Sequence, residues 1–320
     1  MTKPLSDIQK DNLILGYCCI NTELREQDIF CSRTCRLSTI REKKVEYSYK
    51  LARQNLRDLE TIIRWNHSNN IYNFRMSSDM FPFSSHQEFC DKYNFEQFRE
   101  TLKYIGDISK EFNQLLTFHP SQFNQLSSHR ECVIINTIVE INTHAKIMDM
   151  MGLNSNSIII LHGGSKNGGK AEALSRLATN YKRLSITAQK RLVLENCEMC
   201  YTIADLLPIS RELNIPIVVD SHHHNINPSP GFTFGELINL AVVIWDRRKL
   251  IPVFHISESR SGVLVTDSIT SRRGHSNYVL KIPQEFLELS KTQAIYIDIE
   301  AKMKERAVRL LHKSYSFHKK

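Results

Sequence analysis

The stretch IPIVVDSHHHNINP, residues 215–228, contains the pattern that decides the fold. Apolar and mostly β-branched residues run up to Asp220, and three histidines follow after a single serine. A short apolar run without polar alternation is typical of a strand that is buried on both faces, as in a parallel sheet. A carboxylate and imidazoles at its end indicate a polar site at the carboxyl end of that strand.

Similar apolar runs recur along the chain and alternate with longer segments of helical periodicity. We expect strands at 13–20, 71–77, 114–120, 157–164, 191–196, 215–222, 251–257 and 294–300. We expect helices at 40–67, 95–112, 131–151, 170–189, 201–214, 233–249 and 301–313. Strands that alternate with helices predict parallel βαβ units, and eight units in about 300 residues fit an α/β fold of the TIM (β/α)8 type. A doubly wound sheet with fewer strands is the alternative.

The expected organisation is a single barrel domain at 13–305, with an N-terminal tail at 1–12 and a basic C-terminal tail at 306–320. The 320 residues include 42 basic and 34 acidic side chains, a net charge of +8, which favours a polyanionic partner such as nucleic acid. No run reaches the ~18–20 apolar residues of a membrane span, and the N-terminus is too polar for a secretory signal. The eight cysteines are scattered. We therefore expect reduced thiols and an intracellular protein that works near DNA, in cytoplasm or nucleus.

From the third expected strand onward, every strand ends at a residue that can bind a metal ion. These residues are His119, His162, Glu195, Asp220, His255 and Glu300, and the loops after the second and sixth strands add His86 and His223. The carboxyl ends of TIM barrel strands converge on one face, so these side chains are expected to meet there. A single histidine at a strand end is more often structural, but six consecutive strands of this kind predict a metal site. Histidine and carboxylate sets suit zinc, manganese or iron, and carboxylates can bridge two ions.

The same stretches resemble the UV damage endonuclease (UVDE) family from about residue 13 to about residue 305. The matching motifs are GYCCIN (16–21), YNFRMSSDMFPFSSH (72–86), LTFHPSQF (116–123), MDMMGL (148–153), LHGG (161–164), RLVLEN (191–196), YTIADLLP (201–208), IPIVVDSHHHNINP (215–228), FHISES (254–259), RRGHSNYV (272–279) and DIEAKMKE (298–305). Their order along the chain makes the resemblance specific.

The resemblance implies a TIM barrel nuclease related to the endonuclease IV type, with two or three divalent metal ions. Manganese is the expected ion, with zinc, cobalt and magnesium as alternatives. Such an enzyme would nick DNA immediately 5′ to pyrimidine dimers and other lesions, leaving a 3′-hydroxyl and a 5′-phosphate. The implied ligands are His86, His119, His162, Glu195, Asp220, His223, His255, His275 and Glu300. His275 comes from the resemblance alone, and Glu195, Asp220, His255 and Glu300 are the expected catalytic set.

The resemblance also implies where a lesion in double-stranded DNA would be contacted. Gln122 and Phe123 occupy the position of a probing wedge, and Tyr17 matches a position near the flipped lesion. Asn21 and Arg75 are candidates for contacts to phosphate or to the ligands. For Phe123 the competing expectation is an aromatic ring packed in the core. We expect a monomer without a membrane partner.

One position departs from the family pattern. The family often has a lysine, carboxylated at the metal cluster, two residues before the histidine of the seventh strand, and here Val253 stands in that place. Because the other ligands are intact, we expect an active enzyme that does not depend on a modified lysine. The alternatives are an abasic-site endonuclease, a metal-dependent sugar isomerase and a DNA-binding protein without activity.

Overall fold

The computed structural model describes residues 12–315 and confirms the TIM barrel. Eight strands form a closed barrel in the order of the sequence, β1 to β8. Each of them lies inside an expected strand. Their bounds are β1 Leu13–Cys18, β2 Asn73–Met76, β3 Leu115–Phe118, β4 Ile159–His162, β5 Leu192–Glu195, β6 Ile217–Asp220, β7 Val253–Ile256 and β8 Ile295–Ile299.

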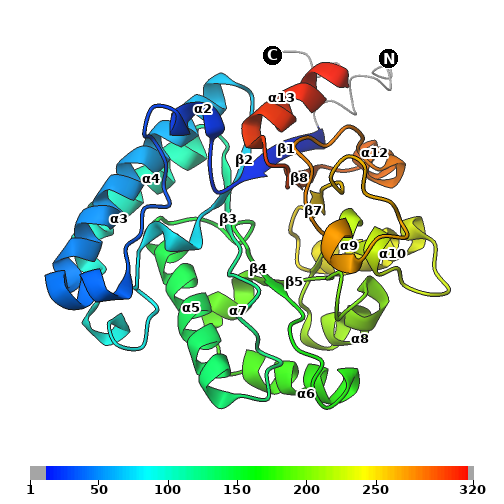
Figure 1. Ribbon diagram of the computed structural model, residues 1–320, viewed down its shortest axis with the longest axis horizontal. Coiled ribbons are helices and arrows are strands. Elements are labelled where there is room, and N and C mark those ends of the chain that lie inside the picture. The colour runs from blue at the N-terminus through cyan, green and yellow to red at the C-terminus, as the bar shows by residue number, and fades with distance from the viewer. Residues whose placement is uncertain (1–11, 316–320) are drawn as a thin grey trace. The chain divides into compact units, whose positions relative to one another are not determined.

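The seven expected helices are present, with short helices and turns between them (Figure 1). The helices are α2 Thr22–Arg25, α3 Leu37–Ser68, α4 Arg99–Glu111, α5 Glu131–Met150, α6 Lys170–Tyr181, α7 Ile186–Arg191, α8 Ile203–Leu213, α9 Ser221–Ile226, α10 Phe234–Arg247, α11 Ile269–Arg272, α12 Gln284–Ser290 and α13 Lys304–Ser314. Short 3₁₀ turns cover Ser78–Met80, Cys90–Lys92 and Glu96–Phe98. The helix expected at 170–189 is two helices, because the Ser185 hydroxyl accepts a hydrogen bond from Ala188 N and starts α7 as its N-cap.

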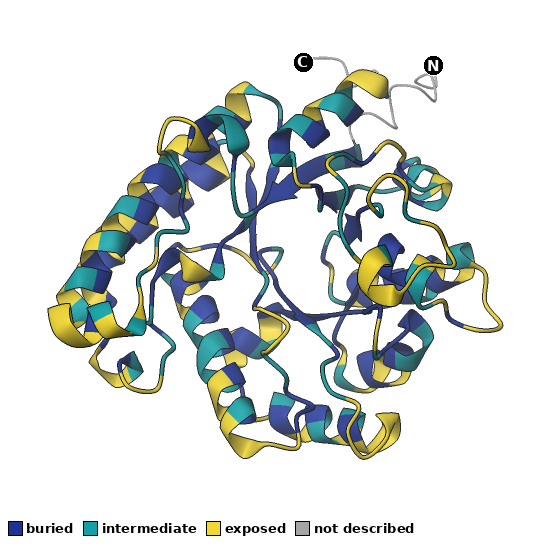
Figure 2. Cartoon of the chain, viewed as in Figure 1, coloured by how far each residue is buried: buried dark blue, intermediate teal, exposed yellow. Residues whose placement is uncertain are grey.

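Contacts divide the chain into two compact units, of which one covers residues 19–192 and contains β2, β3 and β4. β2 and β3 pair in parallel from Asn73↔Leu115 to Met76↔Phe118. On the outside, α3 and α4 run side by side (Figure 1). Strand residues are almost all buried, whereas each long helix has a buried face and an exposed face (Figure 2). This distribution is what a barrel core with an outer ring of amphipathic helices requires.

The other unit contains β1 and β5 to β8, within residues 12–18 and 193–315. β1 pairs in parallel with β8 from Leu13↔Ile295 to Tyr17↔Ile299. The helices α8 and α10 cover β6, where the fully buried Trp245 donates a hydrogen bond of 2.9 Å to Ile217 O. Its Asp220 and His255 are register partners at the ends of β6 and β7.

The final helix changes the expected C-terminal boundary. α13 packs against β1, and its Ala307, Val308 and Leu311 are fully buried. Residues 306–314, expected in a basic tail, therefore belong to a barrel helix, because these apolar residues share one helical face. The remaining parts of both expected tails, 1–11 and 316–320, lie outside the described residues. Among residues 12–315, no helix is both long and apolar enough to cross a membrane.

Candidate metal centre

The carboxyl ends of β5, β6 and β7 bring Glu195, Asp220 and His255 together. Each offers a ligand atom within 4.8 Å of the other two, and all three side chains are fully buried. His255 Nδ1 lies 3.0 Å from Glu195 Oε1. Buried charged groups are unfavourable unless they are paired or bind a metal ion. The strand ends thus form the kind of site that the sequence predicts.

Two further carboxylates, Asp298 and Glu300, surround His255. Asp298 Oδ2 is 3.5 Å from His255 Nε2, and Glu300 Oε1 is 3.4 Å from His255 Nδ1. Burial lowers the pKa of His255, but the negative charges of Glu195, Asp298 and Glu300 outweigh burial and raise it to about 10. The imidazole therefore carries a positive charge that partly neutralises these carboxylates. A divalent cation bound at the same place would neutralise them instead.

His223 joins this group from α9. Asp220 caps that helix, since its Oδ1 accepts a hydrogen bond of 2.7 Å from His223 N. The His223 ring lies with Nδ1 3.0 Å from the carbonyl oxygen of Asn196. The same nitrogen lies 3.5 Å from Glu195 Oε1, so it faces the carboxylates of the centre. Burial opposes protonation of His223, but Asp220 and Glu195 raise its pKa well above the usual value.

The three consecutive histidines have different environments, and they lie in the helix α9 rather than in the expected loop. The capping aspartate explains this helix, because an N-cap satisfies the first backbone amides. The His224 ring stacks on Phe234 with 4.8 Å between centroids, and the His222 ring lies 5.9 Å from that of His275. Both side chains are buried, in line with a supporting role.

Glu300 and His275 complete the set in this unit. Glu300 directly follows β8, and its Oε2 lies 3.8 Å from His275 Nε2. His275 is held by an antiparallel bridge to Ser259. One connected network therefore contains six of the nine expected ligands, namely Glu195, Asp220, His223, His255, His275 and Glu300.

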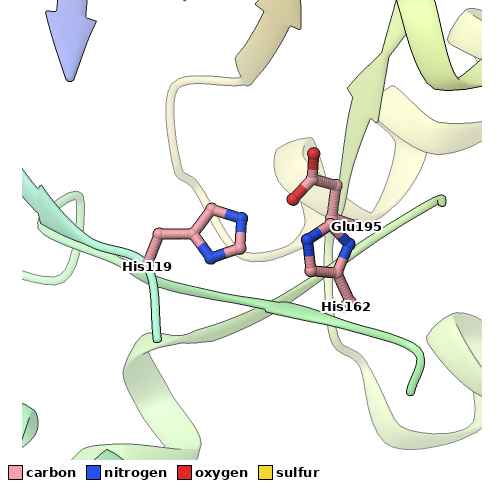
Figure 3. Close-up of side chains that lie close together, drawn as sticks. All are labelled: His119, His162 and Glu195. Carbon is pink, nitrogen blue, oxygen red and sulfur yellow. The ribbon is translucent and has the colours of Figure 1, made fainter. Parts of the chain in front are cut away.

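The other unit carries the remaining three expected ligands. His119 follows β3 and His162 ends β4, and their ring centroids are 4.9 Å apart. Figure 3 draws both side chains and Glu195. His119 Nδ1 lies 2.9 Å from Pro120 O, so that Nε2 is its acceptor nitrogen. His86 packs between Phe83 and Phe89, with centroid distances of 5.7 and 5.5 Å. Among the described residues, His86 is in no group of three metal-capable side chains with ligand atoms within 4.8 Å of one another.

The expected DNA contacts differ in exposure. Phe123 is 76% exposed on the loop after β3, and Gln122 beside it is exposed as well, so the alternative of a core aromatic is wrong. Arg75 on β2 is half-buried. Tyr17 and Asn21 are fully buried, and Asn21 Oδ1 caps α2 by accepting a hydrogen bond of 3.0 Å from Leu24 N. A DNA contact at these two positions would require their side chains to become exposed.

Sequence reasoning missed two acidic residues of the site, Asp298 and Glu198. The run IYIDIE places Asp298 two residues before Glu300, and residues i and i+2 of a strand share a face. The sequence therefore contained a signal that Asp298 lies on the same face as Glu300. Glu198 gives no periodic signal. Its Oε2 lies 3.6 Å from His223 Nε2 and its Oε1 lies 3.0 Å from Arg273 Nε.

Comparison with known proteins shows the family of the chain. The family model described as UV-endonuclease UvdE matches residues 13–319. The chain belongs to the UvdE family. It is 38% identical to a UV-damage endonuclease of Schizosaccharomyces pombe over 94% of this chain, and it spans only 50% of that relative's length. It is 32% identical to a UV DNA damage endonuclease of Bacillus cereus (strain B4264), with 84% of this chain and 83% of the relative covered.

Among solved structures, the fold of the chain is similar to that of another UvdE-type protein. The crystal structure of SacUVDE superposes with a TM-score of 0.81 at 28% identity and covers 96% of this chain and 100% of its own. Endonuclease IV from Thermus thermophilus has a TM-score of 0.55 at 13% identity, with 81% of this chain and 93% of its own covered. At that identity, the likeness to endonuclease IV concerns the barrel fold alone.

Proposed function

We propose that this UvdE-family chain is a metal-dependent DNA repair endonuclease. It nicks the phosphodiester immediately 5′ to UV photoproducts in double-stranded DNA and leaves a 3′-hydroxyl and a 5′-phosphate. The observation that carries the proposal is the buried group of Glu195, Asp220 and His255 at three adjacent strand ends.

The chemistry of the donors fits divalent cations. Asp220 is fully buried, and among the described residues its Oδ2 has no hydrogen-bond partner. The nearest cationic nitrogen, His223 Nδ1, is 3.7 Å away, which is beyond hydrogen-bond length. A buried carboxylate oxygen of this kind needs a cation, and mixed oxygen and imidazole ligands suit manganese or zinc. We propose manganese, with zinc, cobalt and magnesium as the alternatives.

His119 and His162 are proposed to serve the same centre as Glu195, because the family resemblance implies a single cluster of ligands. His86 and His275 remain proposed ligands on the family resemblance.

The protein's own groups have separate tasks in the proposed reaction. Glu195 and Glu300 would hold divalent cations, and His255 would lose its proton to the solvent when it serves as a ligand. Divalent cations at this place would supply a nucleophilic water at neutral pH and neutralise charge on the phosphate. Phe123 and Gln122 probe the stack, which a lesion has already weakened, so that insertion is easiest there. The net charge of +8 supports a DNA partner, and we propose that the chain acts on it as a monomer inside the cell.

The test uses an end-labelled duplex with one defined pyrimidine dimer, and matched duplexes that are undamaged or carry an abasic site. With Mn²⁺ we expect a nick just 5′ to the dimer, no nick in the undamaged duplex and no nick in chelator. Glu195→Gln should slow nicking by more than about 100-fold. Mutation of residues that only hydrogen-bond to metal ligands already lowers metal affinity or activity 10- to 100-fold, and Glu195 is a proposed ligand itself. Glu212→Gln, the same change on the exposed surface of α8, is the control.

Each other outcome reassigns the protein. Cleavage only at the abasic site would move it to the endonuclease IV type of activity. Absence of cleavage on all three duplexes would favour a sugar substrate or an inactive DNA-binding protein. Unchanged nicking by Glu195→Gln would remove that residue from the mechanism.

A further inference from the structure

A long segment after β7, residues 259–275, begins and ends beside the proposed metal centre, and we call it the β7 arm. Its two ends are joined by the antiparallel bridge between Ser259 and His275. Arg260 N donates to Gly274 O at 3.1 Å, and Ser276 N donates to Glu258 O at 2.8 Å. Because His275 is a proposed ligand, the base of the arm lies at the centre itself.

Two arginines fasten the base of the arm to its surroundings. The Arg272 guanidinium donates to Asn225 O at 3.1 Å, next to α9. Arg273 Nε lies 3.0 Å from Glu198 Oε1, the carboxylate whose other oxygen faces His223. The Ser259 hydroxyl donates to Arg272 O at 2.6 Å. The arm is therefore anchored at several points rather than loosely attached.

The tip of the arm exposes two adjacent aliphatic side chains. Leu264 is 64% exposed and Val265 is 83% exposed. A hydrogen-bonded turn holds them outward, since Asp267 N donates to Leu264 O at 3.0 Å and Leu264 N donates to Asp267 Oδ2 at 2.9 Å. The preceding turn, in which Val263 N donates to Arg260 O at 3.2 Å, contains Gly262 with a positive φ of 83°. Two adjacent exposed aliphatic side chains on an ordered turn are available for contact with another molecule.

We propose that Leu264 and Val265 form a second apolar wedge, in addition to Phe123, that inserts into the base stack of the damaged duplex. This proposal rests on the proposed function. Because both ends of the arm are fixed beside the proposed centre, a duplex whose phosphodiester lies there passes close to the base of the arm. The arm also carries three arginines against one aspartate, and since Arg273 is paired with Glu198, Arg260 and Arg272 are the charges that complement phosphate. Aliphatic residues such as leucine are the side chains that proteins insert between base steps.

The test compares Leu264→Ser/Val265→Ser with Ile186→Ser, a control that removes an aliphatic side chain 66% exposed on α7. All proteins carry Glu195→Gln to prevent cleavage. Anisotropy measures the Kd for dimer-containing and undamaged duplexes, and 2-aminopurine opposite the lesion reports unstacking. We expect the arm variant to bind the dimer duplex about tenfold more weakly, to change undamaged binding by less than about twofold, and to lose the fluorescence increase. The control should behave like the parent.

The outcomes separate this inference from the proposed function. Equal losses on both duplexes would make the arm a general DNA contact and overturn the wedge. A variant that binds both duplexes like the parent would assign the exposed tip to another protein and overturn the proposal as well. Failure of the proposed function would instead appear in the unmodified chain, as the absence of nicking at the dimer with Mn²⁺.

Discussion

The change Asp220→Asn should stabilise the metal-free protein while removing its response to metal. Burial raises the pKa of Asp220, His223 opposes this shift, and the repulsion of Glu195 and Glu300 adds to it. An acid whose pKa is higher in the folded state than in the unfolded state loses stability when it ionises as the pH rises. At neutral pH the charged Asp220 therefore lowers the free energy of unfolding. Asparagine has nearly the same shape and keeps an oxygen for the cap of α9.

The size of the effect follows from one buried oxygen. Asp220 Oδ2 makes no hydrogen bond to the described residues, and a buried group of this kind costs more when it is charged than the about 1–3 kcal/mol of a neutral one, so that removal of the charge regains an amount of that order. In chelator, we expect Asp220→Asn to raise the free energy of unfolding by about that amount. With Mn²⁺ at 100 times its Kd, the wild type should gain about 2.7 kcal/mol, and the variant should gain little of it.

Urea unfolding in chelator and in Mn²⁺ measures both effects. The matched control is Asp58→Asn, since Asp58 is also buried but its Oδ2 is paired with Arg33 and accepts a hydrogen bond of 2.9 Å from Phe30 N. That change should lower stability by about 1.5–3 kcal/mol in both conditions, because a hydrogen-bonded charge is lost. The reasoning is refuted if Asp220→Asn destabilises the chelated protein as Asp58→Asn does.

Two further predictions concern proton release and the wedge. The pKa of His255 is raised to about 10, so the metal-free protein keeps this proton at pH 8. Binding of Mn²⁺ should therefore release about one proton, and the affinity for Mn²⁺ should increase as the pH rises toward 10. Calorimetry in buffers of different ionisation enthalpy measures the release, and buffer-independent heats would contradict it. Phe123→Ala should weaken binding to the dimer duplex about tenfold, the worth of one stacked base, with little change on undamaged DNA. Tyr104→Ala, at an aromatic ring 48% exposed on α4, is its control, and equal losses on both duplexes would disprove the wedge.

The strands and most of the proposed ligands were predictable because their signals are local in the chain. An apolar run such as IPIVVD predicts a buried strand, and its period and length decide this without knowledge of its neighbours. Once eight such strands alternate with helices, the barrel places their ends on one face. Glu195, Asp220 and His255 follow from that rule alone, and the structure brings them within 4.8 Å of one another.

Only the tertiary structure decided which charged groups form ion pairs and which side chains are exposed to solvent. Glu198 is paired with Arg273, and Asp298 is paired with His255, and neither pair is close in the sequence. In the same way, Phe123 is exposed and Tyr17 is buried, although both are aromatic residues near strand ends. Burial and electrostatic contact depend on residues that the chain brings together only when the barrel closes. Periodicity along the sequence therefore determines where the strands end, and packing determines what their last residues can do.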